Sequence, residues 1–143
     1  KIYNESVKKK FFKRSKLVDL KNHKKWFYNE IKSKKSSIFF WIKKNNKKKI
    51  GYVRFNMINK KSWEISIANS PDFRSKGYGT LMLKNSIKKF RLNKKVKLIS
   101  VVKKNNLRSE KCFLKNSFKK KIAKSYFLKN KISLYKYNYL ELN

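Results

Sequence analysis

Residues 70–83 read Ser70-Pro71-Asp72-Phe73-Arg74-Ser75-Lys76-Gly77-Tyr78-Gly79-Thr80-Leu81-Met82-Leu83, and they contain two of the three glycines and the only proline of the 143-residue chain. A short apolar segment, Trp63–Ala68, precedes them. Glycine is needed where a backbone takes a positive φ or passes very close to a ligand. A strand, a turn with paired glycines and then a helix direct several backbone N–H groups to one point, where the helix dipole adds positive potential. The stretch therefore predicts an anion-binding site.

The centre of this stretch, Arg74–Gly79, resembles the acyl-CoA-binding motif of the GNAT family of N-acetyltransferases. That motif is Arg or Gln, two residues, Gly, one residue, then Gly or Ala, and every specified position is filled here. Two other glycine loops do not fit, because a dinucleotide fingerprint needs a third glycine where Met82 stands and a Walker loop needs Gly-Lys-Ser/Thr after a four-residue gap. The resemblance implies acetyl-CoA as the cofactor, with its pyrophosphate held by the loop amides.

A second segment carries the same resemblance. In the family, a strand is followed by Asn, two residues, Ser or Ala, an aromatic residue four positions later, and a closing Gly-Phe pair. Asn106, Ser109, Phe113 and Phe118 fit this pattern, and Ser117 stands where glycine is usual. The two matches occur in the family's order along the chain.

Length and composition favour one domain, residues 1–143, with a packed core, since 40% of the residues are hydrophobic and 15% aromatic. No apolar run is long enough for a membrane span, and no secretory segment opens the sequence. Cys112 is the only cysteine, which is typical of a protein of the reducing cytoplasm.

The charge is extreme, with 42 Lys and Arg against 7 Asp and Glu and a formal net charge of +35. Of the basic residues 37 are lysines, spread over every segment, and Asn, Ile, Phe and Tyr are abundant as well. This composition is typical of an AT-rich coding sequence, so we interpret the charge as solvated surface. It predicts non-specific binding of polyanions at low salt and no specific nucleic-acid partner.

Hydrophobic periodicity predicts a mixed α/β chain. Asp19 or Asn22 is expected to cap a helix over residues 20–33. The resemblance implies the same order of elements in a GNAT fold, a central twisted, mostly antiparallel sheet of six to seven strands flanked by about four helices. The expected helices are 5–15, 20–33, one that follows the glycine turn and ends near 90, and 106–116, and the expected strands are 38–42, 50–57, 62–68, 95–102, 119–128 and 131–139, the last two joined by a turn at Asn130-Lys131.

The resemblance also assigns the cofactor site, residue by residue. The strand after Glu64 is expected to meet the pantetheine arm through its backbone, and a free amide there serves as oxyanion donor. No metal is expected. The expected cofactor-binding residues are Ile65, Ile67, Ala68, Arg74, Ser75, Lys76, Gly77, Tyr78, Gly79, Thr80, Asn106 and Phe113.

Acetyl transfer to an amine needs a general base, because an ammonium must lose a proton before it attacks. Glu64 and His23 are the candidates, with a lysine-paired strand glutamate and an exposed helix histidine as the structural alternatives. Many relatives carry a tyrosine, interpreted as the acid for the departing thiolate, where this chain has Phe113. Either Tyr126 or Tyr135 supplies that proton, or the thiolate leaves unassisted, which its pKa of about 8.5 permits. Cys112 is interpreted as a core thiol.

Three segments, His23–Phe27, Ile50–Phe55 and Glu64–Ile67, resemble a subgroup that acetylates amino-sugar nucleotides, including enzymes of pseudaminic-acid biosynthesis. Trp26 and Arg54 are then candidate substrate residues, whereas Trp41 is expected in the core. The acceptor is accordingly a small-molecule amine, and the protein a monomer or homodimer. Two alternatives stay open: a protein N-terminal or ribosomal-protein acetyltransferase, and a non-catalytic polyanion-binding protein on the same scaffold.

Overall fold

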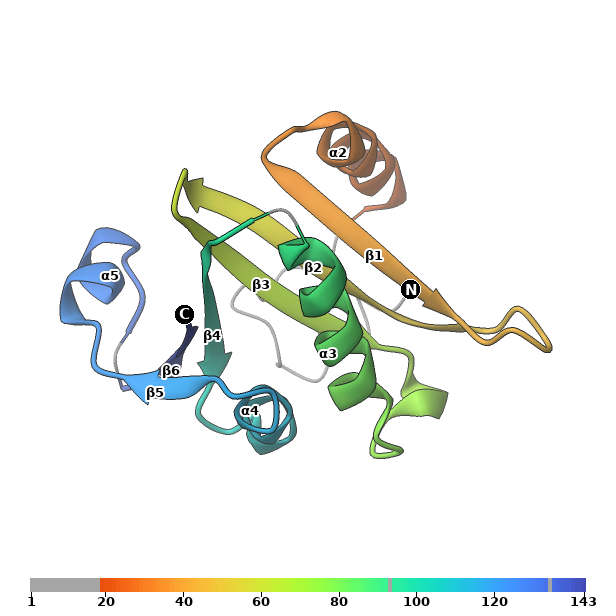
Figure 1. The fold of residues 1–143 in the computed structure, drawn as a ribbon. Helices are drawn as coiled ribbons and strands as arrows, with labels where there is room; N and C mark the ends of the chain where they lie inside the picture. Colours follow the sequence, from red (N-terminus) through yellow and green to blue (C-terminus); the bar gives the residue numbers. More distant parts are fainter. Residues whose placement is uncertain (1–18, 93, 134) are drawn as a thin grey trace.

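The computed structural model describes residues 19–92, 94–133 and 135–143 (Figure 1). The helix expected over 5–15 lies outside these residues. The described elements are α2 (Leu20–Lys32), β1 (Ser36–Ile42), β2 (Lys49–Asn59), β3 (Ser62–Asn69), the 3-10 turn η1 (Pro71–Phe73), α3 (Tyr78–Arg91), β4 (Lys97–Lys103), α4 (Leu107–Leu114), β5 (Lys119–Lys121), α5 (Lys124–Lys129) and β6 (Tyr137–Leu142).

The described strands form one six-stranded sheet in the order β1-β2-β3-β4-β6-β5. Every neighbouring pair is antiparallel except β3 and β4, which are parallel. A parallel pair needs a crossover connection, and α3 provides it. The expected mixed α/β fold with a mostly antiparallel sheet is therefore confirmed.

The parallel pairing of β3 with β4 is short. It consists of Ser62 with Lys97, Trp63 with Leu98, and Glu64 with Ile99, and Figure 1 shows the two strands diverging beyond that point. Backbone amide and carbonyl groups are strong hydrogen-bonding groups that must find partners. The edge of β3 after Glu64 is thus a place where a ligand can lie between two strands.

One face of the sheet carries the main core under α3, as Figure 1 shows. The alternation of β2 and β3 places Val53, Phe55, Trp63 and Ile65 on this face, in agreement with the sequence pattern. The Phe55 ring stacks on Phe90 of α3, with 4.0 Å between ring centroids. Trp41 also packs against this core, as expected, and its Nε1 donates to Ser86 Oγ at 3.0 Å. The residues of α3 buried here are Met82, Leu83, Ser86, Ile87 and Phe90.

The opposite face carries α2 at one side and α5 at the other (Figure 1). Asp19 caps α2, because its carboxylate accepts from the N–H groups of Lys21 and Asn22. Phe27 of α2 packs edge-on against Phe40 of β1, with centroids 5.9 Å apart. No residue of α2 is buried, so this helix lies on the sheet without contributing to the core.

The hairpin expected over residues 119–139 is wrong. The structure has only the three-residue strand β5, then α5, and β6 begins at Tyr137. Phe127 is 2% exposed and packs against Ile99 and Tyr139, so the burial of this ring favours a helix here over a strand. Asn130 and Lys131 end that helix rather than turning a hairpin.

The glycine in β2 is required by close packing. A Cβ on Gly51 would lie 2.2 Å from the carbonyl oxygen of Ala68 and 2.9 Å from Met82 Cε. Gly79, by comparison, has room for a Cβ, whose nearest neighbours would be Asn69 Nδ2 at 3.4 Å and Cys112 Sγ at 3.5 Å. Gly51 therefore lets the end of β3 and the α3 helix approach β2.

Gly51→Ala is expected to lower the free energy of unfolding by about 2 kcal/mol or more, because an overpacked core typically loses about 1–3 kcal/mol. Urea unfolding followed by circular dichroism measures the change. The control is Gly79→Ala, which should leave the value unchanged or raise it by up to about 1 kcal/mol through helix propensity. Equal effects of the two substitutions would contradict this account of Gly51.

Candidate active site

The turn between β3 and α3 has the backbone of an anion site. Ser75 and Gly77 have φ values of 61° and 77°, and both are exposed together with Lys76. The N-cap of α3 is Gly77, and no side chain caps the helix. The first N–H groups of an uncapped helix attract negative charge, as does the positive end of the helix dipole. The predicted anion-binding geometry is therefore present.

The turn is held in place from both sides. Arg74 is half-buried, and its Nε donates to the carbonyl oxygen of Asn69 at 3.2 Å. Ser70 donates from its backbone N–H to Ile50 O and from its hydroxyl to Lys49 O, both at 2.7 Å. Phe73 is buried and packs edge-on against Tyr78. Arg74 thus attaches the turn to the end of β3, a role beyond the cofactor contact expected of it.

Helix α4 and the residues that follow it contact the start of α3, next to the glycine turn. Asn116 Nδ2 donates to the carbonyl oxygen of Thr80 at 3.3 Å. Burial raises the pKa of the Cys112 thiol, whose side chain hydrogen-bonds to Thr80. A raised pKa leaves little thiolate at neutral pH, which agrees with the interpretation of Cys112 as a structural thiol.

Two predicted cofactor residues belong to α4 and its cap. Asn106 is the N-cap, and its Oδ1 accepts from the Ser109 N–H at 3.3 Å. Phe113 is 1% exposed and packs against Phe118, so its ring belongs to the core. Contact of these two residues with a cofactor stays a prediction.

Glu64 occupies the last position at which β3 pairs with β4. Because side chains alternate along a strand, it points to the face opposite the buried Trp63 and Ile65. Tyr126 of α5 forms a side-chain hydrogen bond with Glu64. Burial first, and then the nearby Glu64 carboxylate, raise the pKa of Tyr126 well above its usual range.

A second group of predicted residues lies on the same face, toward α2. The Arg54 guanidinium lies 5.3 Å from the ring centroid of Trp26, which stacks on His23 with centroids 5.2 Å apart. Arg54 is paired with Ser66, and Asn56 with Glu64, so Arg54 and Glu64 are diagonal neighbours on adjacent strands. Two tyrosines are candidate acids for the departing thiolate. Tyr126 lies beside Glu64, to which its side chain is hydrogen-bonded, whereas Tyr135 is 90% exposed.

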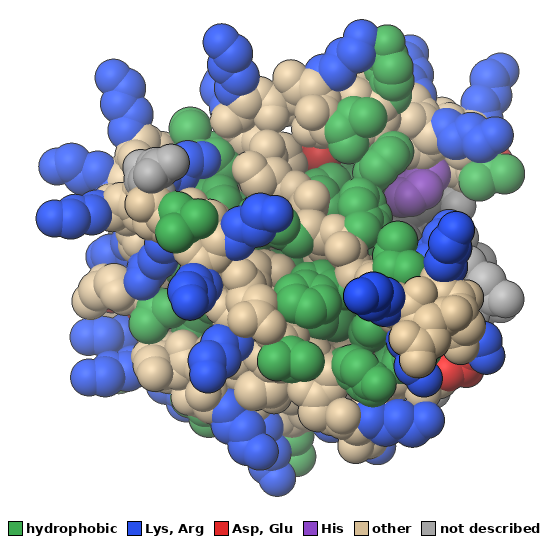
Figure 2. Space-filling view, turned by 45° about the vertical axis from the view of Figure 1, so that its right-hand side comes forward, with side chains coloured by type: hydrophobic (Ala, Val, Ile, Leu, Met, Phe, Trp, Pro, Cys, Tyr) green, Lys and Arg blue, Asp and Glu red, His purple; other side chains and the backbone are tan. Residues whose placement is uncertain are grey.

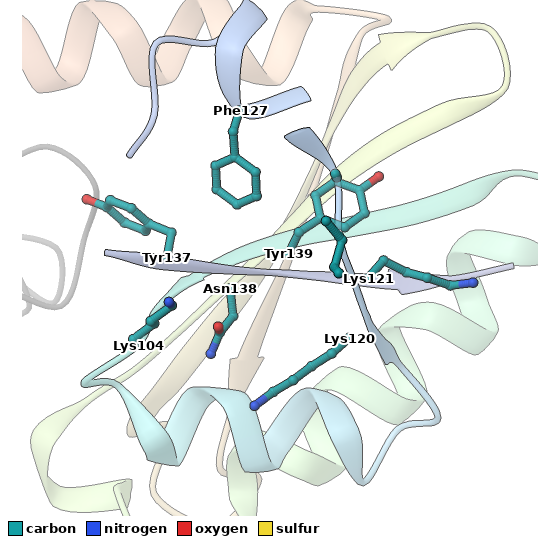
Figure 3. Close-up of a pocket in the computed structure, with 9 residues that line it drawn as sticks. Lys104, Lys120, Lys121, Phe127, Tyr137, Asn138 and Tyr139 are labelled. Atoms are coloured by element: carbon teal, nitrogen blue, oxygen red, sulfur yellow. The ribbon is translucent and has the colours of Figure 1, made fainter. Parts of the chain in front are cut away.

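The structure also shows a lysine-lined pocket at the β6 side of the sheet (Figure 3). Lys120 and Asn138 both bind the carboxylate of Glu110, which is otherwise buried in α4. These contacts join α4 to the outer strands. The other labelled residues of the pocket are Lys104, Lys121, Phe127, Tyr137 and Tyr139.

Positive charge is dispersed on the visible face of the molecule. Figure 2 shows Lys and Arg side chains over the whole face and around its edge, with hydrophobic side chains between them. Among the described residues, no helix is long and apolar enough to cross a membrane. The same part of the chain contains no group of three or more His, Cys, Asp or Glu placed to hold a metal ion.

Sequence reasoning missed two features of this area. The Tyr126 contact depends on α5, which was expected as a strand, although Tyr126 itself was a candidate acid. No local pattern indicated this short helix, because the burial of Phe127 depends on Ile99, which is distant in sequence. The tight packing at Gly51 had no signal beyond the scarcity of glycine in the chain.

Comparison with solved structures shows a shared fold. Campylobacter jejuni N-acetyltransferase PseH in complex with acetyl coenzyme A is 21% identical, with a TM-score of 0.69 over 90% of this chain and 82% of that one. Spermidine N-acetyltransferase from Vibrio cholerae, in complex with CoA and spermine, is 14% identical, with a TM-score of 0.79 over 99% and 85%. Ribosomal-protein-alanine N-acetyltransferase from Brucella melitensis is 19% identical, with a TM-score of 0.74 over 99% and 89%.

A search of curated protein sequences finds no match. The model of the acetyltransferase (GNAT) family matches residues 3–118, which include the strand divergence, the glycine turn and the capped α4 helix. The chain therefore belongs to the acetyltransferase (GNAT) family and is an N-acetyltransferase that uses acetyl-CoA.

Proposed function

We propose that this enzyme N-acetylates the primary amine of an anionic small molecule, most favourably a nucleotide-linked amino sugar, with Glu64 as the general base. The observation that carries the proposal is the position of Glu64. Its carboxylate lies where β3 and β4 diverge, on the face of the sheet opposite the main core and diagonal to Arg54.

The residues around the divergence fit acetyl-CoA. The backbone N–H groups at the start of α3 suit its pyrophosphate, since Gly77 is in the left-handed region and the helix end is uncapped. The unpaired edge of β3, including Ile65, Ile67 and Ala68, suits the pantetheine arm. When bound, acetyl-CoA supplies a thioester activated toward an amine.

Glu64 then has a defined task. An acceptor amine is an ammonium ion at neutral pH, and it must lose a proton before its nitrogen can attack. A carboxylate within hydrogen-bond reach can take this proton. His23 is separated from the divergence by Trp26 and Arg54, which favours a role in acceptor binding over that of base.

The charges of the described residues favour an anionic acceptor. Arg54, braced by the Trp26 ring, offers a guanidinium beside Glu64 for a phosphate or carboxylate. The net charge of +35 repels polyamines and the basic tails of ribosomal proteins. Glu30 and Glu141, also on this face, already bind Ser36 and Lys97. A nucleotide-linked amino sugar combines phosphates for Arg54 with a ring face for Trp26.

We further propose that the reaction takes place in the cytoplasm, within one domain formed by residues 1–143. Cys112 as the single, half-buried thiol supports a reducing compartment. The continuous sheet from β1 to β5 supports a single unit.

Gly77→Val is expected to weaken acetyl-CoA binding by roughly 5- to 150-fold. A β-branched residue in the left-handed region costs about 1–3 kcal/mol, so the turn abandons the conformation that presents its amides. Calorimetry at roughly 0.3 M salt measures the affinity while screening loose surface contacts.

The matched control is Lys76→Ala, which removes a neighbouring charge and leaves the backbone free to keep its conformation. Its affinity should fall by no more than about fivefold, since an exposed charge contributes up to about 1 kcal/mol. A larger loss for Lys76→Ala than for Gly77→Val would assign binding to the charge and overturn the role of the amides.

Glu64→Gln is expected to lower kcat by about 10²- to 10⁴-fold, the usual contribution of a general base, with unchanged acetyl-CoA affinity. Steady-state kinetics with a UDP-linked 4-amino sugar measures it. Glu141→Gln is the control, because Glu141 is a carboxylate on the same face of the sheet, paired with Ile99 from the other side. A Glu64→Gln enzyme with the parent kcat would remove Glu64 as the base.

Arg54→Met keeps the aliphatic stem over Trp26 and removes the charge. It should raise KM for the UDP-linked amino sugar by about 10- to 100-fold, because a charge-assisted hydrogen bond contributes about 1.5–3 kcal/mol. Lys89→Met, on an exposed position of α3, should leave KM unchanged. Faster turnover of spermidine than of the sugar nucleotide by the parent enzyme would overturn the anionic acceptor.

A further inference from the structure

Helix α5 is short, yet its position on the sheet is firmly fixed. Phe127 is buried against Ile99 of β4 and Tyr139 of β6. The Phe127 and Tyr139 ring centroids lie 6.4 Å apart, in an edge-to-face arrangement. Such aromatic packing stabilises a contact beyond the buried area alone. Phe127 thus anchors α5 to β4, which neighbours β3, and to β6 beyond it.

The end of α5 is fixed by hydrogen bonds at Tyr126 and Phe127. The carbonyl oxygen of Tyr126 accepts from the Asn130 backbone N–H at 3.1 Å and from Asn130 Nδ2 at 2.8 Å. Ile132 N donates to Phe127 O at 2.9 Å, and Lys131 is left-handed with a φ of 51°. This is the pattern of a Schellman helix end. The backbone of Tyr126 is therefore held rigidly.

The side chain of Tyr126 extends from this fixed backbone to Glu64. Its ring packs edge-on against Tyr139, with 5.1 Å between centroids, and its hydroxyl is hydrogen-bonded to the Glu64 side chain. Glu64 and Ile99 are register partners, so the carboxylate lies beside the residue on which α5 is anchored. Glu64 of β3 is thus contacted by a helix that follows two further strands, β4 and β5, along the chain.

We propose that Tyr126 is a positioning residue that holds the Glu64 carboxylate toward the acceptor amine. This inference rests on the proposed role of Glu64 as the base. A phenol O–H that donates to a carboxylate oxygen fixes the orientation of the carboxyl group. A base must lie within about 2.6–3.2 Å of the proton it removes, so a fixed rotamer matters.

The positioning of Glu64 by Tyr126 matters more because the surface of the protein is rich in lysine. The chain has 42 Lys and Arg, many of them long and mobile, and each can draw an exposed carboxylate into an ion pair. A half-buried tyrosine occupies one oxygen of Glu64 with a neutral partner. The raised pKa of Tyr126, due first to burial, keeps it a proton donor at any physiological pH. The same property makes it a poor acid for a departing thiolate.

Tyr126→Phe tests the inference, because the ring and its packing on Tyr139 stay while the hydroxyl is lost. With a UDP-linked 4-amino sugar, kcat should fall about tenfold, less than the roughly 10²- to 10⁴-fold loss expected when the base itself is removed. KM for acetyl-CoA and the melting temperature should match the parent enzyme. Tyr137→Phe, from the same aromatic cluster, is the control and should keep the parent kcat.

The double variant separates positioning from a merely structural role. If Tyr126 acts through Glu64, adding Tyr126→Phe to Glu64→Gln should lower kcat no further, because coupled residues are not additive. A full second tenfold loss would overturn the inference, as would a parent kcat for Tyr126→Phe beside a slow Glu64→Gln. A parent kcat for Glu64→Gln itself would instead overturn the proposed base, and the inference with it.

Discussion

The divergence of β3 from β4 shapes both the ligand site and the packing of the two faces of the sheet. Three register pairs hold the strands together and then pairing stops. Two parallel strands that part leave backbone hydrogen-bonding groups in need of partners, which is costly unless solvent or a ligand supplies them. A strand divergence is therefore both a structural cost and a ligand site. The glycine turn follows directly at the end of β3, so the exposed strand edge and the uncapped start of α3 are adjacent pieces of one segment.

The divergence also explains the unequal packing of the two faces. Helix α3, which makes the crossover, covers the main core with Met82, Leu83 and Phe90 fully or nearly fully buried. On the other face, α2 and α5 cover the two sides of the sheet, and Glu64 lies on the strand between them. Two other acidic residues on this face, Glu30 and Glu141, each make a structural contact, with Ser36 and with Lys97 respectively.

The sequence predicted the helices and strands that backbone sterics and hydrophobic periodicity determine within one segment. The glycine turn, the strands expected over 50–57 and 62–68 and the helix expected to end near 90 follow from backbone sterics and hydrophobic periodicity. The end of the chain was misassigned for the opposite reason. Alternating tyrosines and the Asn130-Lys131 pair fit a hairpin equally well, and only the burial of Phe127 against Ile99, distant in sequence, selects a helix. The Glu64–Tyr126 contact was unpredictable for the same reason.

This chain has Phe113 where many relatives carry a tyrosine. The reason follows from comparing two demands: a base for the acceptor amine and an acid for the departing thiolate. Phe113 lies in the core, so α4 brings an apolar ring to that position. A thiol has a pKa of about 8.5. At pH 7 the free thiolate therefore lies only about 2 kcal/mol above the protonated thiol, so release without an acid is a small cost. An aliphatic amine with a pKa near that of lysine, about 10.4, holds its proton far more strongly, at about 4–5 kcal/mol. Removing the amine proton is therefore the larger demand on the protein. Under the proposed mechanism, Glu64 at the divergence, with Tyr126 beside it, would meet that demand with one of the few carboxylates the chain has.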